Sequence, residues 1–567
     1  MSQQIVKLDD PARNPETASS STIADKTVPS IPTNDPKDAS EGSDASSPTI
    51  YPTSLPLALI FLSLCTTTFL VALGGTIIAT AIPTITNDFN SLSDVSWYNS
   101  AFSLTTCAFQ LPFGRAYTLF NTKFVFLAAI AIFEVGSVVC GATPNSVGLI
   151  VGRAVAGIGG GGIFSGCFII IAESTPLRKR SLFTGFVGGT FGIASVVGPL
   201  IGGEFTTRVT WRCQHPNRCR RPSNRHLLPP PLHRPLSPDL KSKTSWEIFK
   251  KFDPIGTAIF IPSIICLLLA LQWGGGQYEW SSPRVIATFV CFGVTFIACV
   301  VIQTMLGEDA TVPVSILRQR SVIGACSFMM FGSASFTAVV YYLPIWFQAI
   351  RQDNAEESGI HTLPLILSLI IISIASGGAV VAVGYYTPFL FVGSIVIIGA
   401  WIGYQIIFGA GIGMTLEQCS IAIQTALPEK QIPAGTSLSV LVRSLGGSIA
   451  VAICQNVFER KLRSNLEDVL PGVDLSFISG SGATTLVQKA NAALGGDAGA
   501  VEKVLLLYND ALVQTFLVAL VLAACTFLMA LLVEWKSVKK EKREKKIGDS
   551  EAEPAAPEEE DVKSEKA

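Results

Sequence analysis

The sequence predicts an all-α membrane protein built from many transmembrane helices. Of its 567 residues, 49% are apolar and only 15% are charged, and the mean hydropathy is +0.47. This composition is too apolar for a soluble protein of this length. Apolar runs of about 20 residues, the length that crosses a bilayer, recur along the chain. Its 49 glycines would let such helices pack closely.

Both ends of the chain are polar. Residues 1–50 are rich in Ser, Thr, Pro and Asp, so we expect a disordered cytoplasmic tail and no cleavable signal peptide. Residues 536–567 begin with the basic run KSVKKEKREKK and then turn acidic. A basic run beside a last span is typical of the cytoplasmic side, so we predict a charged cytoplasmic tail. Binding of lipid headgroups by this run is the alternative.

Thirteen apolar segments are predicted to span the membrane, and one of them is short. In chain order they are residues 57–80, 97–114, 124–143, 147–172, 181–203, 254–273, 284–306, 321–349, 361–384, 386–400, 401–424, 433–458 and 513–535. Arg115, Lys123 and the loop PLRKRS follow even-numbered spans, whereas Asp88 and Asp94 follow the first span. Because positive loops lie inside, both termini are predicted to be cytoplasmic.

One stretch, residues 212–240, breaks this pattern. The fifth span should end outside, near Trp211, yet four lysines from Lys241 to Lys251 indicate the cytoplasmic side before the next span. One more crossing is therefore required, but the stretch is rich in Pro, Arg and His and cannot cross as a helix. Its Cys and His residues lack the spacing of a zinc site. A basic targeting signal would need a cytoplasmic loop, whereas this stretch is predicted to begin outside.

The codons of this stretch suggest an explanation. Read one nucleotide later, codons for CQHPNRC allow Val-Asn-Ile-Pro-Ile-Gly-Ala, and those for HLLPPPLH allow Ile-Phe-Phe-Leu-Leu-Leu-Phe-Ile. A mis-assigned splice site or a sequencing error would turn such an apolar helix into this run. We therefore hypothesise that residues 213–238 are a frame-shifted sixth span. If the shift occurs in the cell, the protein should misfold or be inactive.

Three motifs identify a family resemblance. LIVGRAVAGIGGGGIFSG (149–166) places Arg153 in an apolar helix beside a glycine ladder, and GIASVVGPLIGG (192–203) carries a Gly-Pro-x-x-Gly-Gly element. With residues 97–123, in this order and spacing, they resemble the major facilitator superfamily, and within it the fungal fourteen-span drug:proton antiporters. The resemblance implies the major facilitator fold, with two six-helix bundles and two extra spans.

The resemblance also implies a division of the chain. Spans one to five of the first bundle would occupy residues 51–211, and residues 212–240 stand where the sixth span is expected. A cytoplasmic loop and the extra spans would follow in residues 241–320. Residues 321–535 would hold the second bundle and the C-terminal span. Fourteen spans are expected, of which thirteen are recognisable.

Two charged residues inside apolar helices are the candidates for proton coupling, because a charge at that depth is costly unless it is paired or hydrated. Arg153 matches the fourth-span arginine that the resemblance implicates in coupling. A structural arginine bonded to backbone carbonyls is the alternative. Glu134 lies mid-span in FLAAIAIFEVGSVVCG and could carry a proton. A hydrogen-bonded structural acid is the alternative there.

The Gly-Pro-x-x-Gly-Gly element consists of Gly198, Pro199, Gly202 and Gly203. In the family this element marks antiporters, which are exporters. Its proline bends a helix and its glycines allow close approach of a neighbour, so a packing role is compatible with a gating role.

A second family motif, Gly-x-x-x-Asp-x-x-Gly-x-Lys, belongs to the cytoplasmic loop after span two. Gly114 and Lys123 fit its ends, and Arg115 adds a charge. Thr118 and Asn121 stand at its aspartate and second glycine positions. The charge relay that the family builds there is therefore incomplete in this sequence.

Polar side chains within spans are candidates to line a substrate cavity at the midplane. The predicted cavity residues are Tyr98, Gln110 and Gln348, and the same type of side chain recurs at Gln272, Tyr341 and Gln405. For any single one, a role in the core or at a helix interface is the alternative. Glu417 and Arg443 are predicted to lie near span ends, from which long side chains reach the membrane surface.

These features predict proton-coupled efflux of small hydrophobic molecules (a secondary metabolite, mycotoxin or drug) across the plasma membrane by alternating access. A vacuolar or vesicular membrane is the alternative location. A proton-coupled uptake carrier and an inactive, non-transporting protein are the competing functions. The sequence has no nucleotide-binding loop and no metalloprotease or carboxylate-cluster motif. We therefore predict no enzyme, cofactor, metal ion or nucleic-acid partner, and a monomer that engages substrate, protons and the lipid bilayer.

Overall fold

The computed structural model describes residues 54–89, 91, 94–208, 212, 245–274, 278–399, 405–469 and 498–539. The chain divides into Met1–Ile50, which lies outside this description, and a second unit, Tyr51–Ala567. The predicted N-terminal tail, nearly all of the anomalous stretch 212–240 and most of the predicted C-terminal tail also lie outside it.

The described residues form helices joined by short turns, with two isolated bridges and no strand among them. The first group comprises α1 (Ser54–Thr76), η1 (Ile77–Thr80), α2 (Ile82–Phe89), α3 (Val95–Leu119), α4 (Thr122–Ala142), α5 (Ser146–Ser174) and α6 (Leu177–Arg208). The next comprises α8 (Ser245–Lys251), α9 (Pro254–Trp273), α10 (Pro283–Leu306), η5 (Gly307–Asp309) and α11 (Val314–Leu317). The last comprises α12 (Arg320–Ile350), α13 (Ala355–Val383), α14 (Thr387–Gly399), α15 (Gln405–Ala426), η7 (Glu429–Gln431), α16 (Ile432–Val469) and α19 (Ala498–Ala530).

The all-α membrane class is confirmed. Eleven of the described helices are long and apolar enough to cross a membrane. Two further predicted spans correspond to α3 and to the 13-residue α14. The α3 helix is not among the eleven, and its sequence carries polar groups such as Asn99, Gln110 and Arg115. The predicted sixth span lies outside the described residues.

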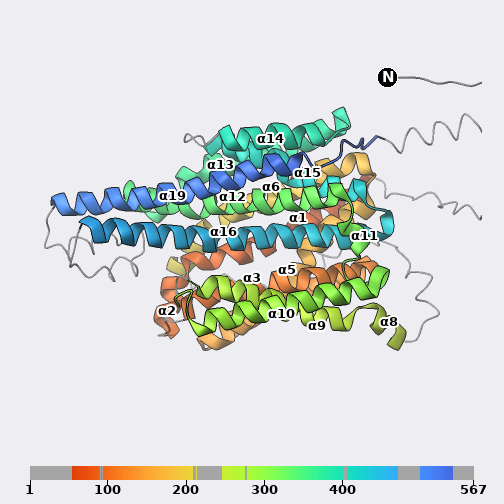
Figure 1. Cartoon of the computed structure of the whole chain (residues 1–567), viewed down its shortest axis with the longest axis horizontal. Coiled ribbons are helices and arrows are strands. Elements are labelled where there is room, and N and C mark those ends of the chain that lie inside the picture. Colours follow the sequence, from red (N-terminus) through yellow and green to blue (C-terminus); the bar gives the residue numbers. More distant parts are fainter. Residues whose placement is uncertain are drawn as a thin grey trace, which may run out of the picture. The chain divides into compact units, whose positions relative to one another are not determined.

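Contacts between helices define two groups and a lateral pair (Figure 1). The α5 helix packs against α3 and α4, and α1 packs against α6. In the second group, α12 packs against α16 and α19, and α15 packs against α13 and α14. The groups meet where α6 contacts α13 and where α3 contacts α16, while α9 and α10 pack together and touch the first group through α3.

The last two long helices extend further than the predicted spans 433–458 and 513–535. The α16 helix continues to Val469, and α19 already begins at Ala498. Both project beyond their neighbours at the left of Figure 1. Their extensions share one cluster in which Leu462 and Leu466 of α16 join Val501, Val504 and Tyr508 of α19. The spacing of these apolar residues by three or four places them on one face, and that mutual packing sustains both helices past the predicted boundaries.

The glycine ladder allows α5 to pack at backbone distance against two neighbours. A Cβ at Gly157 would lie 2.4 Å from the carbonyl oxygen of Phe102 in α3. A Cβ at Gly159 would lie 2.4 Å from the amide nitrogen of Phe133 in α4, and one at Gly161 would lie 2.7 Å from a carbonyl oxygen of α3. Glycine is required at these positions because the three helices are too close for any side chain.

Asp253 organises the turn between α8 and α9. It is buried and lies in the left-handed region at φ 54°, which Asp adopts more readily than most residues. Its carboxylate accepts hydrogen bonds from Gly256 N (2.8 Å), Gln303 Nε2 (2.6 Å) and both the amide and hydroxyl of Thr311. One carboxylate thus ties the start of α9 to α10 and to the segment after η5.

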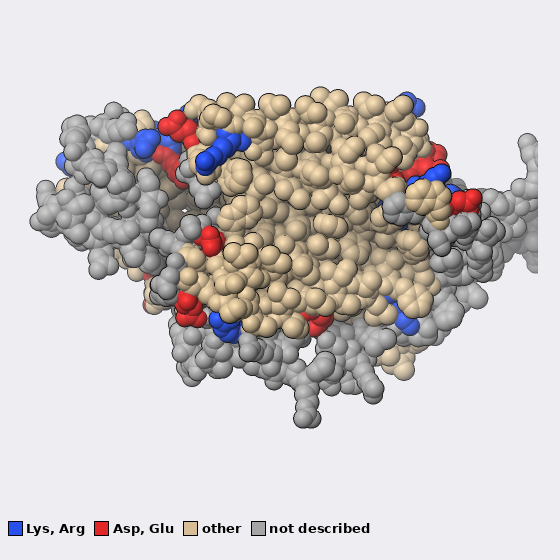
Figure 2. Space-filling model, turned by 90° about the horizontal axis from the view of Figure 1, so that it is seen from below, with Lys and Arg blue, Asp and Glu red and all other residues tan. Residues whose placement is uncertain are grey.

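The surface of the described helices has the distribution expected in a bilayer. On the face in Figure 2, Lys, Arg, Asp and Glu gather mainly towards two ends, with a broad band between them that shows few charges. Exposed apolar side chains include Phe124 (70%), Ile297 (65%) and Ile371 (62%). A patch of this extent on a soluble protein would aggregate, so these residues face lipid.

Candidate functional site

Arg153 is buried where α1, α3 and α5 meet. Its guanidinium donates to the carbonyl oxygens of Gly74 (2.5 Å) and Tyr98 (2.8 Å) and, more weakly, to Asn99 Oδ1 (3.4 Å). It also stacks 4.6 Å from the Phe102 ring centroid. Gly74 lies in the last turn of α1, where carbonyls lack helical donors. This geometry is the one expected of the structural alternative, an arginine bonded to backbone carbonyls.

Glu134 occupies the middle of α4 and is half-buried. Its neighbour Val135 and Val138, one turn further on, are both more than half exposed, whereas Phe133 packs into the first-group core. Glu134 therefore lies at the border between the core-facing and lipid-facing sides of α4. Glu134 thus lies away from the contacts between the two groups, which α6 makes with α13 and α3 makes with α16.

The Gly-Pro-x-x-Gly-Gly element lies in the second half of α6. A Cβ at Gly198 would stand 2.2 Å from Thr76 Oγ1, at the place where α1 gives way to η1. Gly202 is buried. The side-chain surroundings of Pro199 and Gly203 lie outside the description. The element thus packs α6 against the end of α1 through Gly198.

The cytoplasmic loop motif joins three parts of the chain. A Cβ at Gly114 would lie 2.4 Å from Ser437 Oγ, so the Ser437 side chain of α16 packs directly against the backbone of α3 there. Arg115 donates to the carbonyl oxygens of Lys251 (2.9 Å) and Asp309 (2.7 Å). These two bonds attach the α9–α10 pair to the end of α3.

The two departures from the loop motif have local roles. Thr118, at the aspartate position, bonds back to the carbonyl oxygen of Gly114 in its own helix. Asn121, at the second glycine position, caps α4 by accepting from the amide of Lys123 (3.0 Å). Lys123 itself is half-buried in the first turn of α4. Neither departure supplies the charge of the family pattern.

The predicted cavity residues occupy different environments. Tyr98 is fully buried, and its hydroxyl bonds to Ser91 (2.8 Å) and Ser146 (3.0 Å) within the first group. Gln110 is also fully buried but points towards the second group, where its amide donates to Ser444 Oγ of α16 (3.2 Å). Gln348 is half-buried near the end of α12. Of the three, Gln110 lies at the contact between the groups.

The other polar side chains of this type are also separated from one another. Gln272 of α9 donates to Ser100 of α3. Tyr341 is half exposed on α12, and Gln405 begins α15. The structure therefore does not bring the predicted polar residues together into one cavity.

The prediction for Glu417 and Arg443 is wrong. Glu417 is 3% exposed and lies well inside α15, and Arg443 Nη1 is 3.0 Å from its Oε1. The two side chains form a buried ion pair between α15 and α16 and do not reach the membrane surface. The predicted span 401–424 placed Glu417 near an end, whereas the helix runs from Gln405 to Ala426.

The first helix group also touches this pair. A Cβ at Gly188 of α6 would lie 2.7 Å from Glu417 Oε1. Beside it, Ser181 of α6 donates to Gln418 Oε1 of α15 (2.8 Å), which is a second polar contact between the groups. The pair thus lies where α6, α15 and α16 meet.

Comparison with known proteins decides the family. The chain is 44% identical over 516 residues to the efflux pump aflT of Aspergillus parasiticus, an alignment that covers 88% of this chain and 99% of that protein. It is 47% identical over 509 residues to the MFS-type efflux pump MFS1 of Trichophyton rubrum, covering 87% and 94%. It is 47% identical over 517 residues to the MFS-type transporter phomT of Diaporthe leptostromiformis, covering 87% and 86%.

The chain belongs to the major facilitator superfamily. The sequence profile described as Major Facilitator Superfamily matches residues 64–213. The fold is similar to those of two solved transporters. One is a bacterial homologue of the human lysosomal transporter Spinster, with a TM-score of 0.50, 13% identity and coverage of 85% and 97%. The other is the proton:xylose symporter XylE, with a TM-score of 0.50, 12% identity and coverage of 86% and 98%.

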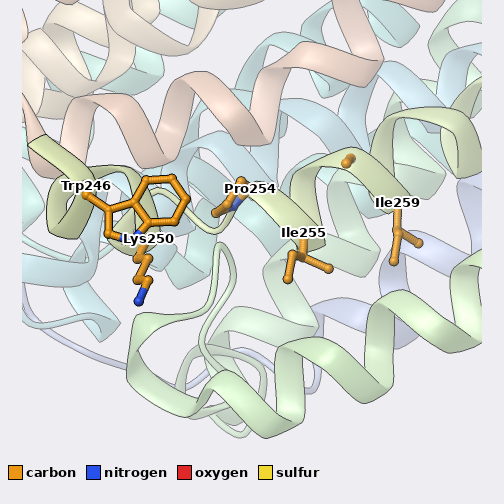
Figure 3. A pocket seen from close by; sticks show the side chains of 6 residues that line it. Trp246, Lys250, Pro254, Ile255 and Ile259 are labelled. Atoms are coloured by element: carbon orange, nitrogen blue, oxygen red, sulfur yellow. The ribbon is translucent and has the colours of Figure 1, made fainter.

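As a facilitator, the protein is a membrane transporter and not an enzyme. Among the described residues, no group of three or more His, Cys, Asp or Glu side chains could hold a metal ion. An exposed groove lies where α8 leads into α9. It is lined by Trp246, Lys250, Pro254, Ile255, Ala258 and Ile259 (Figure 3). None of the predicted site residues lines it, and apolar surface on a membrane helix is expected to contact lipid.

Proposed function

We propose that this facilitator exports hydrophobic small molecules, such as a secondary metabolite, mycotoxin or drug, in exchange for protons. The observation that carries the proposal is its similarity to proteins named efflux pumps, which extends over 99% of the aflT chain and 94% of the MFS1 chain. The Gly-Pro-x-x-Gly-Gly element of α6 agrees with export. Uptake coupled to protons is the competing function.

Alternating access suits the contacts between the two helix groups. The groups meet through α6 with α13 and through α3 with α16. At Gly185 a Cβ would lie 2.6 Å from the carbonyl oxygen of Ser373, and Gly114 lies as close to Ser437. Contacts in which a glycine of one group meets the other group closely suit a rocking motion of one group against the other. Tyr98, Gln110 and Gln348 remain the proposed substrate-facing residues, and Gln110 has the most suitable position.

Proton entry would drive export. The sequence offers Arg153 and Glu134 as candidates for coupling, because a charge at membrane depth is a functional candidate by default. We further propose a monomer in the plasma membrane with both termini in the cytoplasm. The positive charges Arg115, Arg178 and Lys179, which follow the second and fourth predicted spans, support this orientation.

The test is the accumulation of a fluorescent hydrophobic cation, rhodamine 6G, in cells with and without the gene. Export predicts higher accumulation in cells that lack the gene, and a protonophore should abolish the difference. Uptake predicts the opposite sign. Equal accumulation of rhodamine 6G and of a panel of neutral hydrophobic toxins in both cell types would contradict export.

The stretch 213–238 calls for a second proposal, that it is a frame-shifted sixth span. Arg212 donates to the carbonyl oxygen of Thr143, which ends α4. On the other flank, Lys251 accepts from Arg115, beside the turn at which α4 begins. The two flanks are therefore separated by the length of α4, 21 residues or about 32 Å. The match to the family profile also ends at residue 213.

Sequencing the transcript tests this second proposal. We expect a message in which the codons after Arg212 are read in the shifted frame, encoding an apolar helix. A single message that encodes CQHPNRCRR in frame, with no alternative splice form, would contradict it. In that case the export test above should also give no difference, because the first bundle would lack its sixth helix.

A further inference from the structure

The buried ion pair has a depth that suits proton transfer. Gly188 lies eleven residues after the start of α6, and Arg443 lies eleven residues after the start of α16. At about 1.5 Å per residue, both lie about 16 Å along their helices, which is close to half of the roughly 30 Å hydrocarbon core. Glu417 contacts both of them. The pair is thus near the middle of the membrane.

The pair is also isolated from other charges. Glu417 is the one charged residue of α15, and Arg443 is the one charged residue between positions 432 and 458 of α16. The facing parts of the neighbouring helices, residues 181–203 of α6, 321–340 of α12, 362–383 of α13 and 387–399 of α14, carry no charge. The other titratable groups near the pair are the thiols of Cys419 and Cys326, which are uncharged at neutral pH in their ordinary state.

Polar groups lead from the pair towards the cytoplasmic end. Glu417 Oε2 has no hydrogen-bond partner among the described residues. The same holds for Gln418 Nε2 and Gln424 of α15 and for the hydroxyls of Thr436 and Ser437 of α16. All four lie between the pair and the adjoining ends of α15 and α16, where Gln431 donates to Glu308 of η5 and to Ser315 of α11. Buried polar groups without protein partners are typically bonded to water.

We propose that Glu417 is the proton-carrying carboxyl of this transporter and that Arg443 is its counter-charge. The proposal rests on proton-coupled export and names the group that performs the coupling. A proton from outside would form an O–H bond at Oε2 and neutralise the carboxylate, so that the pair with Arg443 is lost. Release along Gln424 and Thr436 would restore the carboxylate and the pair.

The position of the pair explains how protonation would reach the substrate pathway. Glu417 Oε1 lies against Gly188 of the first group, and Arg443 is followed by Ser444, which accepts from Gln110 of α3. Movement of Arg443 after the pair is broken would therefore disturb both contacts between the groups at once. This coupling requires no contact with Glu134, which lies on α4.

The first measurement needs no substrate. Infrared difference spectra of the purified protein in lipid, recorded between acidic and alkaline pH, report the C=O stretch of a protonated carboxyl. We expect a band in the wild-type protein that is lost in Glu417→Gln and kept in Glu459→Gln. Glu459 is a matched control because it lies on α16 and is engaged by Gln455 near the surface. A band that persists unchanged in Glu417→Gln overturns the proposal.

The second measurement separates the proposal from the function on which it rests. In proteoliposomes, rhodamine 6G transport is recorded with and without an imposed pH gradient. Stimulation by the gradient in the wild type, and none in Glu417→Gln with dye exchange preserved, supports the proposal. Stimulation that survives in Glu417→Gln but is lost in Glu134→Gln overturns it while proton-coupled export stands. No stimulation in the wild type contradicts proton-coupled export. In that case the loss or persistence of the infrared band in Glu417→Gln still shows whether Glu417 takes up a proton.

A double variant controls for misfolding caused by an unpaired buried charge. Glu417→Gln leaves Arg443 buried without a counter-charge, so a double variant, Glu417→Gln with Arg443→Gln, removes both charges. We expect the double variant to fold like the wild type, as judged by size-exclusion chromatography, and to lack both the infrared band and the stimulation by the gradient. Stimulation at the wild-type level in the folded double variant would also overturn the proposal.

Discussion

Replacing Gly159 by alanine is expected to remove most of the folded protein. The new Cβ would lie 2.4 Å from the amide nitrogen of Phe133 and 2.6 Å from the carbonyl oxygen of Ala129. Both are backbone atoms of α4, so no side-chain rotation can relieve the clash, and α4 and α5 must separate. Overpacking of a core costs about 1–3 kcal/mol and occasionally more, and a clash with backbone on this scale belongs at the upper end.

The effect should appear in a thermal unfolding curve followed with a thiol-reactive dye. Cys140, Cys167 and Cys326 are among the buried free thiols that become reactive only on unfolding. A matched control is Gly293→Ala in α10, where a new Cβ would meet nothing within 4 Å. That variant should be as stable as the wild type or slightly more so, because Ala is the better helix former by about 1 kcal/mol. Equal melting temperatures for the two variants would show that α4 and α5 are not packed at backbone distance.

The helices of this protein could be predicted from sequence because each is a local pattern. A run of about 20 apolar residues leaves few alternatives in a bilayer, where every backbone polar group must be bonded within its own segment. The thirteen predicted segments correspond to thirteen helices for this reason. The ends of α16 and α19 could not be predicted, because Leu462 and Val501 stabilise each other across 39 positions of the chain.

The partners of charged residues were harder to predict than their presence. The sequence indicates a charge within an apolar helix at Arg153 and allows backbone carbonyls as its partners, but it cannot identify those of Gly74 and Tyr98. The Glu417–Arg443 pair was missed because the span was predicted to begin at 401, which placed Glu417 near its end. One signal is present: the consecutive predicted spans 401–424 and 433–458 each carry a single charge, and the signs are opposite.

Replacement of Arg153 by methionine is expected to have an effect as large as that of Gly159→Ala, for an electrostatic reason. Methionine fills much of the same volume but supplies no donor, so the carbonyls of Gly74 and Tyr98 lose their bonds to Arg153. Hydrogen bonds to a charged group contribute about 1.5–3 kcal/mol each. We expect a large fall in melting temperature, whereas Arg320→Met should change it little, because Arg320 is exposed and bonds a single carbonyl, that of Leu531.

Lysine at position 153 distinguishes the two roles proposed for this arginine. Lysine keeps the charge but is a point donor and cannot hold two carbonyls in the fixed geometry of a guanidinium. If Arg153 is structural, Arg153→Lys should lower the melting temperature, and the protein that remains folded should still respond to a pH gradient as the wild type does. If Arg153 takes part in coupling, the stimulation by the gradient per folded molecule should fall as well. The carbonyl partners of Arg153 and the position of Glu417, in a different helix group, lead us to expect the first result.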